Sequence, residues 1–379
     1  MNVQISSNTV NRLKAAFIVF KKDPVFSASF ILAAASCIIA EPMASYIDFK
    51  VLACLFNIMV IVKAFDELHL LERMSVSILN KCSTSRRASL VLIMLSFFCS
   101  MLLTNDVALL TLVPLALIIG KKSGMDMMPV IILQTLAANI GSSLTPMGNP
   151  QNLYLFSYFR LHAGQFFTTV GIFASLGFVW LLLLNQRNPD SRLDFRLDQV
   201  DIKDTRLAAV WGAAFVVIVL SVFGIVHYAV AFILTLVLTL CLNRKLLLKV
   251  DYPLLLTFIC FFIFIGNISH MPLVSGLMKS FLDTGTKTYF GSILLSQIIS
   301  NVPCAILLSG FTAYWRELLL GVNIGGMGTI IASLASVISY KLYIADKPDN
   351  AGAYMARFSI YNLISLALFT LLNYLLLQL

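Results

Sequence analysis

Four short polar motifs interrupt long apolar stretches of this chain, and they form two similar pairs. The first pair is Leu103-Thr104-Asn105-Asp106 with Asn139-Ile140-Gly141, and the second is Ser300-Asn301-Val302-Pro303 with Asn323-Ile324-Gly325. Hydroxyl and amide groups at such breaks can ligate a cation or hydrogen-bond an oxyanion. Paired interruptions at corresponding places in two halves indicate the central binding site of a secondary transporter. The motifs therefore predict transport rather than catalysis.

The predicted site is a set of mostly neutral polar residues around these breaks. Its members are Thr104, Asn105, Asp106, Asn139, Gly141, Ser142, Thr145, Gly148, Asn149, Ser300, Asn301, Asn323 and Gly325. We expect two candidate Na⁺ sites within it, one at Thr104, Asn105, Asp106 and Gly141, and one at Ser300, Asn301 and Gly325. The motifs contain no Lys or Arg, so amides and helix ends would have to bind an anion. Turn capping by Asn and Ser is the alternative role.

Asp106 is the one formal charge between Ala88 and Gly120. A carboxylate inside a membrane segment is by default a functional residue, as a proton carrier or a cation ligand. The alternative is a helix N-cap for the segment that follows it. The first motif therefore marks the place where ion coupling is expected.

Glycine and proline mark the later break of each pair. The run from Gly141 to Asn152 contains Pro146 and Pro150, which remove backbone donors and prevent a continuous helix. The run from Gly321 to Gly328 is glycine-rich without proline, so it predicts a second broken helix, with close helix packing as the alternative. Backbone groups freed at both breaks would face the site.

The composition identifies an integral membrane protein. The chain is 59% hydrophobic and 12% charged, whereas soluble domains carry roughly 25% charged residues. Its net charge of +9 is spread over short loops and forms no nucleic-acid surface. The seven cysteines and four histidines show no metal-ligand spacing. No cofactor is expected, and no nucleophile–base pair supports an enzyme.

The apolar runs predict an all-α polytopic membrane protein with nine crossings and two re-entrant helical hairpins. The crossings are expected near 25–41, 49–65, 130–159, 165–184, 207–224, 228–243, 252–267, 321–341 and 354–377. Regions 88–119 and 288–312 are the hairpins. The arm 288–299 would be roughly 18 Å long at 1.5 Å per residue, too short for a core of about 30 Å. A single kinked span through 88–119 is the alternative.

Basic residues support this arrangement. With a cytoplasmic N-terminus, 22 of the 27 Lys and Arg residues fall in segments predicted inside and five outside. This places the C-terminus outside, and the membrane is expected to be the cytoplasmic (inner) membrane. The segment 1–24 is predicted to be a cytoplasmic surface helix.

The two halves predict inverted repeats. Phe26 to Leu32 resembles Tyr228 to Leu234 at an offset of 202, and five crossings between them invert the second copy. Repeat 1 spans 25–184, with a scaffold part (25–87) and a transport part (88–184). A cytoplasmic linker covers 185–206, and repeat 2 spans 207–379, with a scaffold part (207–287) and a transport part (288–379).

At its motifs the chain resembles the ion transporter superfamily, which includes arsenite permeases, NhaD-type sodium/proton antiporters, and citrate and divalent-anion/sodium symporters. The divalent-anion branch carries Ser-Asn-Thr at both tips, whereas this chain reads Thr104-Asn105-Asp106 and Ser300-Asn301-Val302. The arsenite-permease branch, with Ala-Asn-Asp and Asn-Asn-Leu-Pro tips, is closer. The resemblance covers the chain from about residue 20 onward.

The resemblance implies a homodimer that works by alternating access. The expected function is secondary active transport of a small anion or oxyanion, inorganic or carboxylate, coupled to Na⁺ or H⁺. A sodium/proton antiporter is the alternative, in which Asp106 exchanges the two cations. A channel built from re-entrant half-helices is a further alternative from another class.

Overall fold

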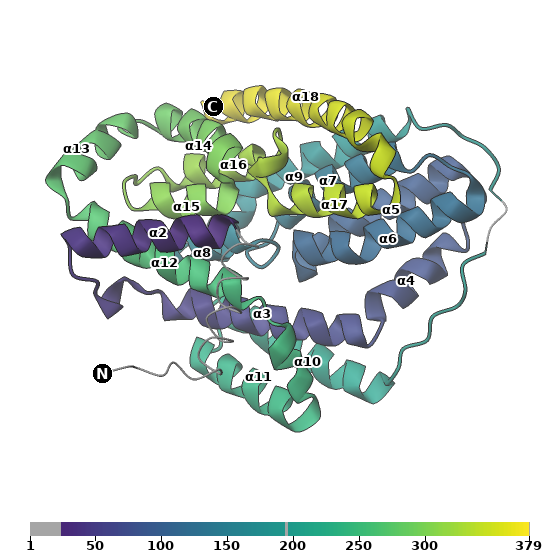
Figure 1. The fold of residues 1–379 in the computed structure, drawn as a ribbon, viewed down its shortest axis with the longest axis horizontal. Helices are drawn as coiled ribbons and strands as arrows, with labels where there is room; N and C mark the ends of the chain where they lie inside the picture. The colour runs from purple at the N-terminus through teal and green to yellow at the C-terminus, as the bar shows by residue number, and fades with distance from the viewer. Residues whose placement is uncertain (1–23, 194–195, 379) are drawn as a thin grey trace, which may run out of the picture.

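The computed structural model describes residues 24–193 and 196–378, and in that part of the chain the regular structure is helical (Figure 1). Most helices lie close to the long axis of the molecule, which is horizontal in Figure 1. The all-helical prediction is confirmed. The predicted N-terminal surface helix lies outside the described residues, apart from Pro24, which begins α2.

The uninterrupted spans predicted from the sequence are helices. They are α2 (Pro24–Ile39), α3 (Phe49–Glu67), α9 (Ala163–Asn185), α10 (Thr205–Val222), α11 (Tyr228–Leu242), α12 (Tyr252–Ser269) and α18 (Ala351–Leu377). Five helices of the described chain are long and apolar enough to cross a membrane: α5 (Ser85–Leu103), α9, α10, α12 and the helix that ends at Leu377. The chain is therefore a multi-pass membrane protein.

The two spans predicted to be broken each consist of two helices. The first is α7 (Met128–Ser142) and α8 (Pro150–Tyr158), and the second is α16 (Trp315–Gly325) and α17 (Leu334–Asp346). The breaks begin later than the sequence indicated. Gly141 still belongs to α7, and Gly321 to Gly325 still belong to α16. These glycines pack tightly inside intact helical turns, so a glycine run by itself did not locate the break.

Each predicted hairpin is a pair of helices joined by a single residue. The first pair is α5 (Ser85–Leu103) and α6 (Asn105–Ser123), and the second is α14 (Gly285–Ile299) and α15 (Asn301–Ser309). The 9 residues of α15 give a helix of roughly 14 Å, whereas the 19-residue arms of the first pair reach about 28 Å. In both pairs the two helices pack against each other.

Short elements that the sequence reasoning missed connect the longer helices. Two are strongly amphipathic, α4 (Leu70–Leu79) and α13 (Pro272–Phe281), and each precedes a hairpin. The 3₁₀ turns are η1 (Ala44–Tyr46), η2 (Arg244–Lys249), η3 (Ile330–Ala332) and η4 (Pro348–Asn350). These two helices do not stand out as apolar runs in the sequence, because their apolar stripe covers only part of the helix.

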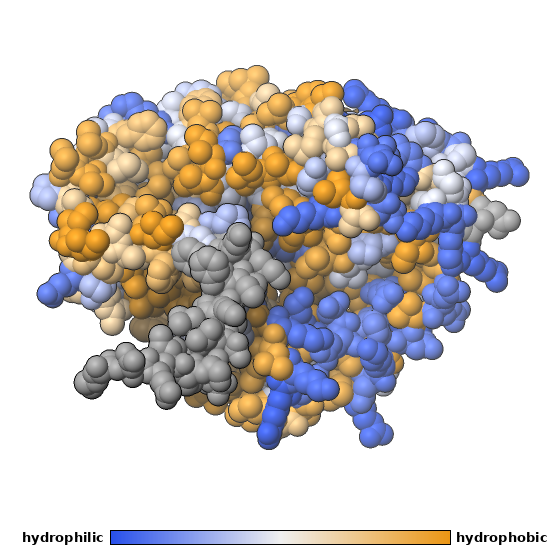
Figure 2. Space-filling view, viewed as in Figure 1, coloured by the Kyte–Doolittle hydropathy of each residue, from blue (hydrophilic) through white to orange (hydrophobic). Residues whose placement is uncertain are grey.

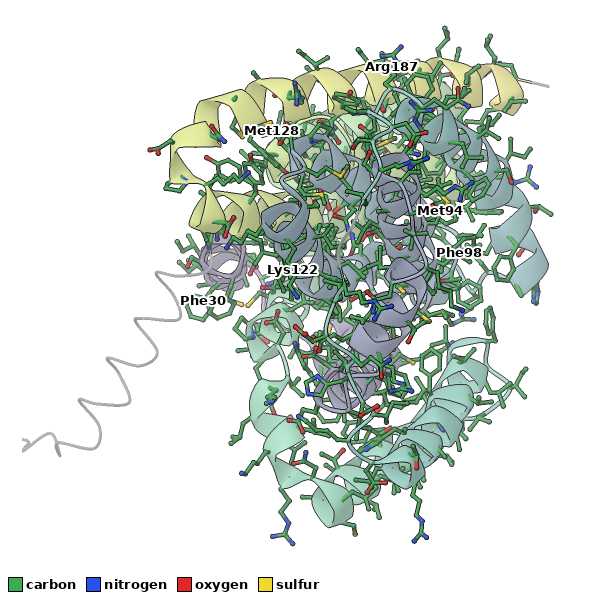
Figure 3. The ribbon with its side chains drawn as sticks, turned by 90° about the vertical axis from the view of Figure 1, so that its right-hand side faces the viewer. Phe30, Met94, Phe98, Lys122, Met128 and Arg187 are labelled. Carbon is green, nitrogen blue, oxygen red and sulfur yellow. The ribbon has the colours of Figure 1, made fainter. Side chains whose placement is uncertain are left out.

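The surface matches a membrane protein. Hydrophilic residues gather toward one end of the visible face, and hydrophobic residues cover much of the rest (Figure 2). Figure 3 looks onto that end and shows Lys122 and Arg187 there, with Phe30 and Phe98 on opposite flanks. Both phenylalanines are about half exposed, at 48% and 51%. Such an apolar flank is stable only against lipid or another protein.

The linker between the predicted repeats runs along α4, α5 and α6. Asn80 exchanges two hydrogen bonds with the backbone of Leu197, which is buried in the apolar cluster beneath. Ser85 accepts from the backbone of Ser191, and Lys122 Nζ lies 3.2 Å from Asp198 Oδ2. The linker thus fastens the base of the first hairpin to its surroundings.

Candidate functional site

Both hairpin tips have the same unusual backbone. Thr104 joins α5 to α6 at φ 92° and ψ 146°, and Ser300 joins α14 to α15 at φ 75° and ψ 155°. Residues with a side chain rarely adopt positive φ, and the surroundings must compensate that strain. The next residue in each case, Asn105 or Asn301, starts the second helix with its amide at the helix N-terminus. Two strained turns of equal shape therefore present equivalent asparagines.

Asn139 is the hub of the first half of the site. Its Oδ1 accepts from Asn105 Nδ2 at 3.3 Å and from Ser333 Oγ at 3.0 Å. Its Nδ2 donates to the backbone oxygen of Gly326 at 3.3 Å. One side chain in the last turn of α7 thus contacts the first tip and the second broken helix. A buried amide with this many bonds fixes the geometry around it.

A second chain of amides links the two breaks. Asn149 Nδ2 donates to Ser142 Oγ at 3.2 Å and to Asn323 Oδ1 at 3.3 Å. Asn323 Nδ2 donates in turn to Asn152 Oδ1 at 2.7 Å. Asn149 also caps α8, because its Oδ1 accepts from the backbone amide of Asn152 at 2.9 Å. Residues about 170 positions apart therefore share one buried hydrogen-bond network.

Several contacts between break and hairpin occur once in each half. Thr145 Oγ1 donates to the backbone oxygen of Met101, and Thr329 Oγ1 donates to that of Gln297 at 3.0 Å. The backbone amide of Asn105 donates to Gly148 O at 3.1 Å. In the second half, Ser300 Oγ donates to Ala332 O at 3.3 Å.

The glycines at the breaks let a helix approach the hairpin backbone. A Cβ on Gly141 would lie 2.2 Å from the carbonyl oxygen of Phe97, and one on Gly325 would lie 2.8 Å from the side chain of Ser296. Both distances are too short for a real side chain, so only glycine fits without movement. Helix α7 therefore packs closely against α5, and α16 packs closely against α14.

Asp106 lies in the first turn of α6, where the helix dipole favours a negative charge. It is not the N-cap, which is Thr104, so the capping alternative is wrong. Its Oδ1 is buried and has no hydrogen-bond partner in the described part of the chain. A carboxylate oxygen removed from water without a donor is costly, and a bound proton or cation relieves that cost.

The second tip carries no such charge. Asn301 Nδ2 approaches the break closely, since a Cβ on Gly326 would lie 2.8 Å from it. The carbonyl oxygen of Gly325 accepts from Gln297 Nε2 at 2.8 Å. The two halves therefore share a backbone plan and differ in the groups that occupy it.

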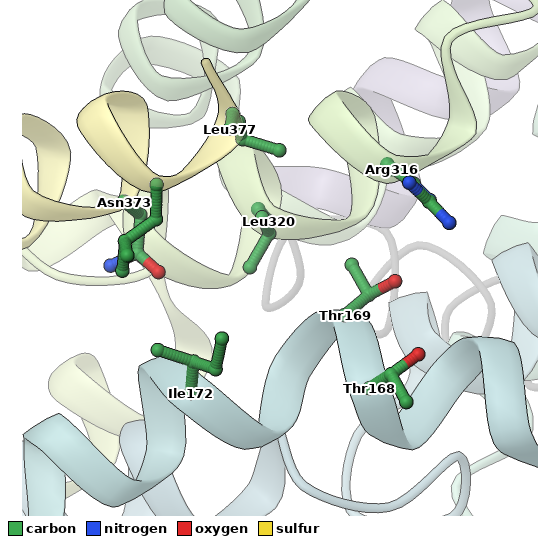
Figure 4. Close-up of a pocket in the computed structure, with 8 residues that line it drawn as sticks. Thr168, Thr169, Ile172, Arg316, Leu320, Asn373 and Leu377 are labelled. Atoms are coloured by element: carbon green, nitrogen blue, oxygen red, sulfur yellow. The ribbon is translucent and has the colours of Figure 1, made fainter. Parts of the chain in front are cut away.

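The structure brings the predicted site residues together. All of them are buried except Thr104 and Asp106, which are partly exposed. A pocket of about 190 Å³ between α9, α16 and α18 lies elsewhere. It is lined by Arg316, Thr168, Thr169, Asn373 and apolar neighbours, none of them a predicted site residue (Figure 4).

Four polar residues of this network were not predicted as site residues: Gln297, Asn152, Ser333 and Thr329. Gln297 could have been found, since it is the one amide side chain in the apolar arm 288–299. Asn152 lies within the polar run that follows Gly141. Ser333 and Thr329 gave no signal of their own, because a lone hydroxyl is common in membrane helices.

Comparisons with known proteins identify the family of the chain. The sequence profile of the citrate transporter family, CitMHS, matches residues 15–313. An uncharacterized transporter of Methanocaldococcus jannaschii is 36% identical over 310 residues, which cover 80% of this chain and 84% of that protein. The inner membrane protein YbiR of Escherichia coli is 28% identical over 341 residues, covering 87% of this chain and 88% of YbiR.

A more distant relative matches a shorter part of the chain. The putative transporter arsB of Dictyostelium discoideum is 26% identical over 137 residues, which cover 36% of this chain and 24% of that protein. The family profile covers most of the chain, and one relative shares more than a third of its residues over four fifths of the chain. The chain therefore belongs to the citrate transporter family of the ion transporter superfamily and is a membrane transporter.

Proposed function

We propose that this transporter moves a small anion or oxyanion across the cytoplasmic membrane by secondary active transport, coupled to Na⁺ or H⁺ at the first hairpin tip. The observation that carries the proposal is the buried network through which both breaks and the first tip share hydrogen bonds, with Asp106 beside it. Such a site lets one movement act on the ion and the substrate together.

The ion would bind at the first tip. Asp106 supplies a buried oxygen that has no hydrogen-bond partner in residues 24–193 and 196–378, and Thr104 and Asn105 supply neutral oxygens beside it. These are hard donors suited to Na⁺, and the carboxylate alone suits H⁺. The ion's positive charge would help an anion to bind nearby, since the motifs contain no Lys or Arg.

The anion would be held by helix N-termini and amide groups. The helices α6, α8 and α15 begin at Asn105, Pro150 and Asn301, inside or next to the network. Their first backbone N–H groups and positive dipole ends favour an oxyanion. Neutral donors of this kind favour a small substrate over a large polyanion, because they supply no full positive charge.

We further propose a homodimer with the N-terminus in the cytoplasm and the C-terminus outside. Helices α2, α3, α10, α11 and α12 pack mainly with one another and would form the scaffold part. The hairpins and broken helices would form the transport part, entering the bilayer from opposite sides as inverted repeats. Alternating access would then move the transport part against the scaffold.

The test is uptake of an anion panel (arsenite, phosphate, sulfate, citrate and succinate) into proteoliposomes, with Na⁺ and pH gradients imposed separately. We expect one anion to accumulate with one gradient. The Asp106→Asn variant should lose that gradient dependence, and Asp349→Asn, an exposed carboxylate in η4, is the matched control. Unchanged dependence in Asp106→Asn would contradict the proposed coupling role.

The sodium/proton antiporter is the second candidate. It is favoured by the buried Oδ1 of Asp106, which has no hydrogen-bond partner among the described residues. Electrogenic exchange of Na⁺ for H⁺ in liposomes free of any substrate anion would support it over anion transport. Single-channel currents without saturable counterflow would instead indicate a channel.

A further inference from the structure

The second hairpin has a residue, Gln297, that bridges the hairpin and the break and has no counterpart among the described residues of the first hairpin. Gln297 lies on α14, one turn before the tip residue Ser300, and its side chain is half-buried. Its Nε2 donates to the backbone oxygen of Gly325 at 2.8 Å and to that of Ile293 at 3.1 Å. Its Oε1 accepts from the backbone amide of Thr329 at 2.9 Å. Both ends of the amide are therefore used.

The matching position of the first half has no such group. Met101 lies three residues before Thr104, as Gln297 lies three residues before Ser300, and each backbone oxygen accepts a bond from a threonine of the break. The thioether of Met101 is at most a weak acceptor and donates nothing. Gly141 O instead accepts from the backbone amide of Leu144 at 3.0 Å, within its own turn. Among the described residues, no side chain of α5 donates to the carbonyl oxygen of Gly141 as Gln297 does to that of Gly325.

A side-chain amide at Gly325 does part of what a bound cation would do. The N–H groups of Gln297 bring positive partial charge to a carbonyl oxygen freed at the end of α16, which is the type of group that ligates a cation at a broken helix. The Gln297 side chain also requires glycine at position 328, because a Cβ on Gly328 would lie 2.3 Å from Gln297 Oε1. Hydrogen bonds of a side chain, rather than a bound ion, thus hold the second tip to its break.

We propose that Gln297 takes the place of a coupling ion at the second tip, so that the transporter couples to one ion per cycle, bound at the first tip. Gln297 is a positioning residue that keeps Gly325 and Ser300 in register without an ion. This inference rests on the proposed function for the identity of the first site. Under this proposal, Gln297 stands in place of the second Na⁺ site expected from the sequence, at Ser300, Asn301 and Gly325.

The experiment measures binding of ²²Na⁺ to the purified full-length protein at fixed ionic strength, together with its thermal stability. Wild type should bind at most one Na⁺ per chain, with a Hill coefficient near one, and Asp106→Asn should lose that ion. Gln297→Glu places a carboxylate against Gly325 O and should gain one Na⁺ site, about doubling the Na⁺ bound at saturation if wild type binds one. The Gln297→Ala variant loses the hydrogen bonds to Gly325 and Thr329. It should unfold at a lower temperature than wild type and regain stability in NaCl.

Ile298→Ala is the matched control, since Ile298 neighbours Gln297 but is 71% exposed on the outside of α14. It should bind Na⁺ as wild type does. Two Na⁺ ions per wild-type chain, with one retained in Asp106→Asn, would overturn the inference while leaving transport intact. So would folded Gln297→Glu and Gln297→Ala proteins whose Na⁺ binding and melting response match wild type. If uptake ignores both gradients, the proposed function fails, and a Na⁺ site gained by Gln297→Glu still supports the role of Gln297.

Discussion

At the scale of single residues, Asn139 and Asp106 have different roles in the site. Asn139 bonds to groups from three segments, and it gives the network its shape. Asp106 has an oxygen without a hydrogen bond to any described residue, so it is the group left to bind a ligand. A side chain that is fully bonded fixes structure, whereas a buried one with a free oxygen stores a cost that a ligand can remove.

Replacing Asn139 by alanine should impair both stability and transport. The change leaves Asn105 Nδ2, Ser333 Oγ and Gly326 O without this partner, at about 1–3 kcal/mol for each buried group that finds no other. We expect a lower melting temperature and uptake reduced at least tenfold in proteoliposomes. Asn362→Ala is the control, because Asn362 is also buried but donates to Phe358 O of its own helix. Wild-type uptake by Asn139→Ala would show that the hub is dispensable.

At the scale of elements, close contact between each broken helix and its hairpin holds the site together. The contact depends on glycine at the point of nearest approach, because a Cβ on Gly141 would lie 2.2 Å from a backbone oxygen of α5. Backbone cannot yield as a flexible side chain can, so helix α7 would have to move as a unit.

Gly141→Ala should therefore separate α7 from α5 and abolish uptake, with a loss of stability of about 1–3 kcal/mol from overpacking. The control is Gly171→Ala in α9, where a Cβ would meet nothing within 4 Å. That change should be neutral or stabilising by up to about 1 kcal/mol, since alanine favours a helix over glycine. Thermal unfolding in detergent and uptake after reconstitution measure both. Equal behaviour of the two variants would show that the close approach is unimportant.

At the scale of the whole molecule, the hydrophilic end seen in Figure 2 and the apolar flanks fit one orientation in the bilayer. The linker adds to this end, because it runs along α4, α5 and α6 with several acidic and basic groups. Basic residues remain on the cytoplasmic side during insertion. We therefore expect the linker inside and the loop around α13 outside.

Cysteine labelling of intact cells tests this orientation. In a background without the seven native cysteines, Lys279→Cys near the end of α13 should react with a membrane-impermeant maleimide. Arg187→Cys in the linker should react only after the cells are opened. Both residues are exposed, so access to them is set by the membrane rather than by burial. The reverse pattern would invert the topology and contradict a cytoplasmic N-terminus.

The sequence by itself determined the class of protein, the long apolar helices and the segments that contain a polar break, because long apolar runs must be helical in a bilayer and proline or a polar group interrupts them locally. The breaks themselves begin later than their glycines indicated. It also located the tips at Thr104 and Ser300 within one residue of the observed turns. These are properties of neighbouring residues along the chain.

Only the tertiary structure decided which polar groups satisfy one another. Three features depend on contacts between distant segments. Asn149 bonds to Asn323, Gln297 donates to the carbonyl oxygen of Gly325, and Asp106 Oδ1 is left without a partner among the described residues. The sequence predicted a candidate ion site at each tip, with a carboxylate, Asp106, at the first tip only. The folded chain adds a second difference, since a side chain one turn before the second tip reaches a carbonyl that is 28 residues away in the sequence.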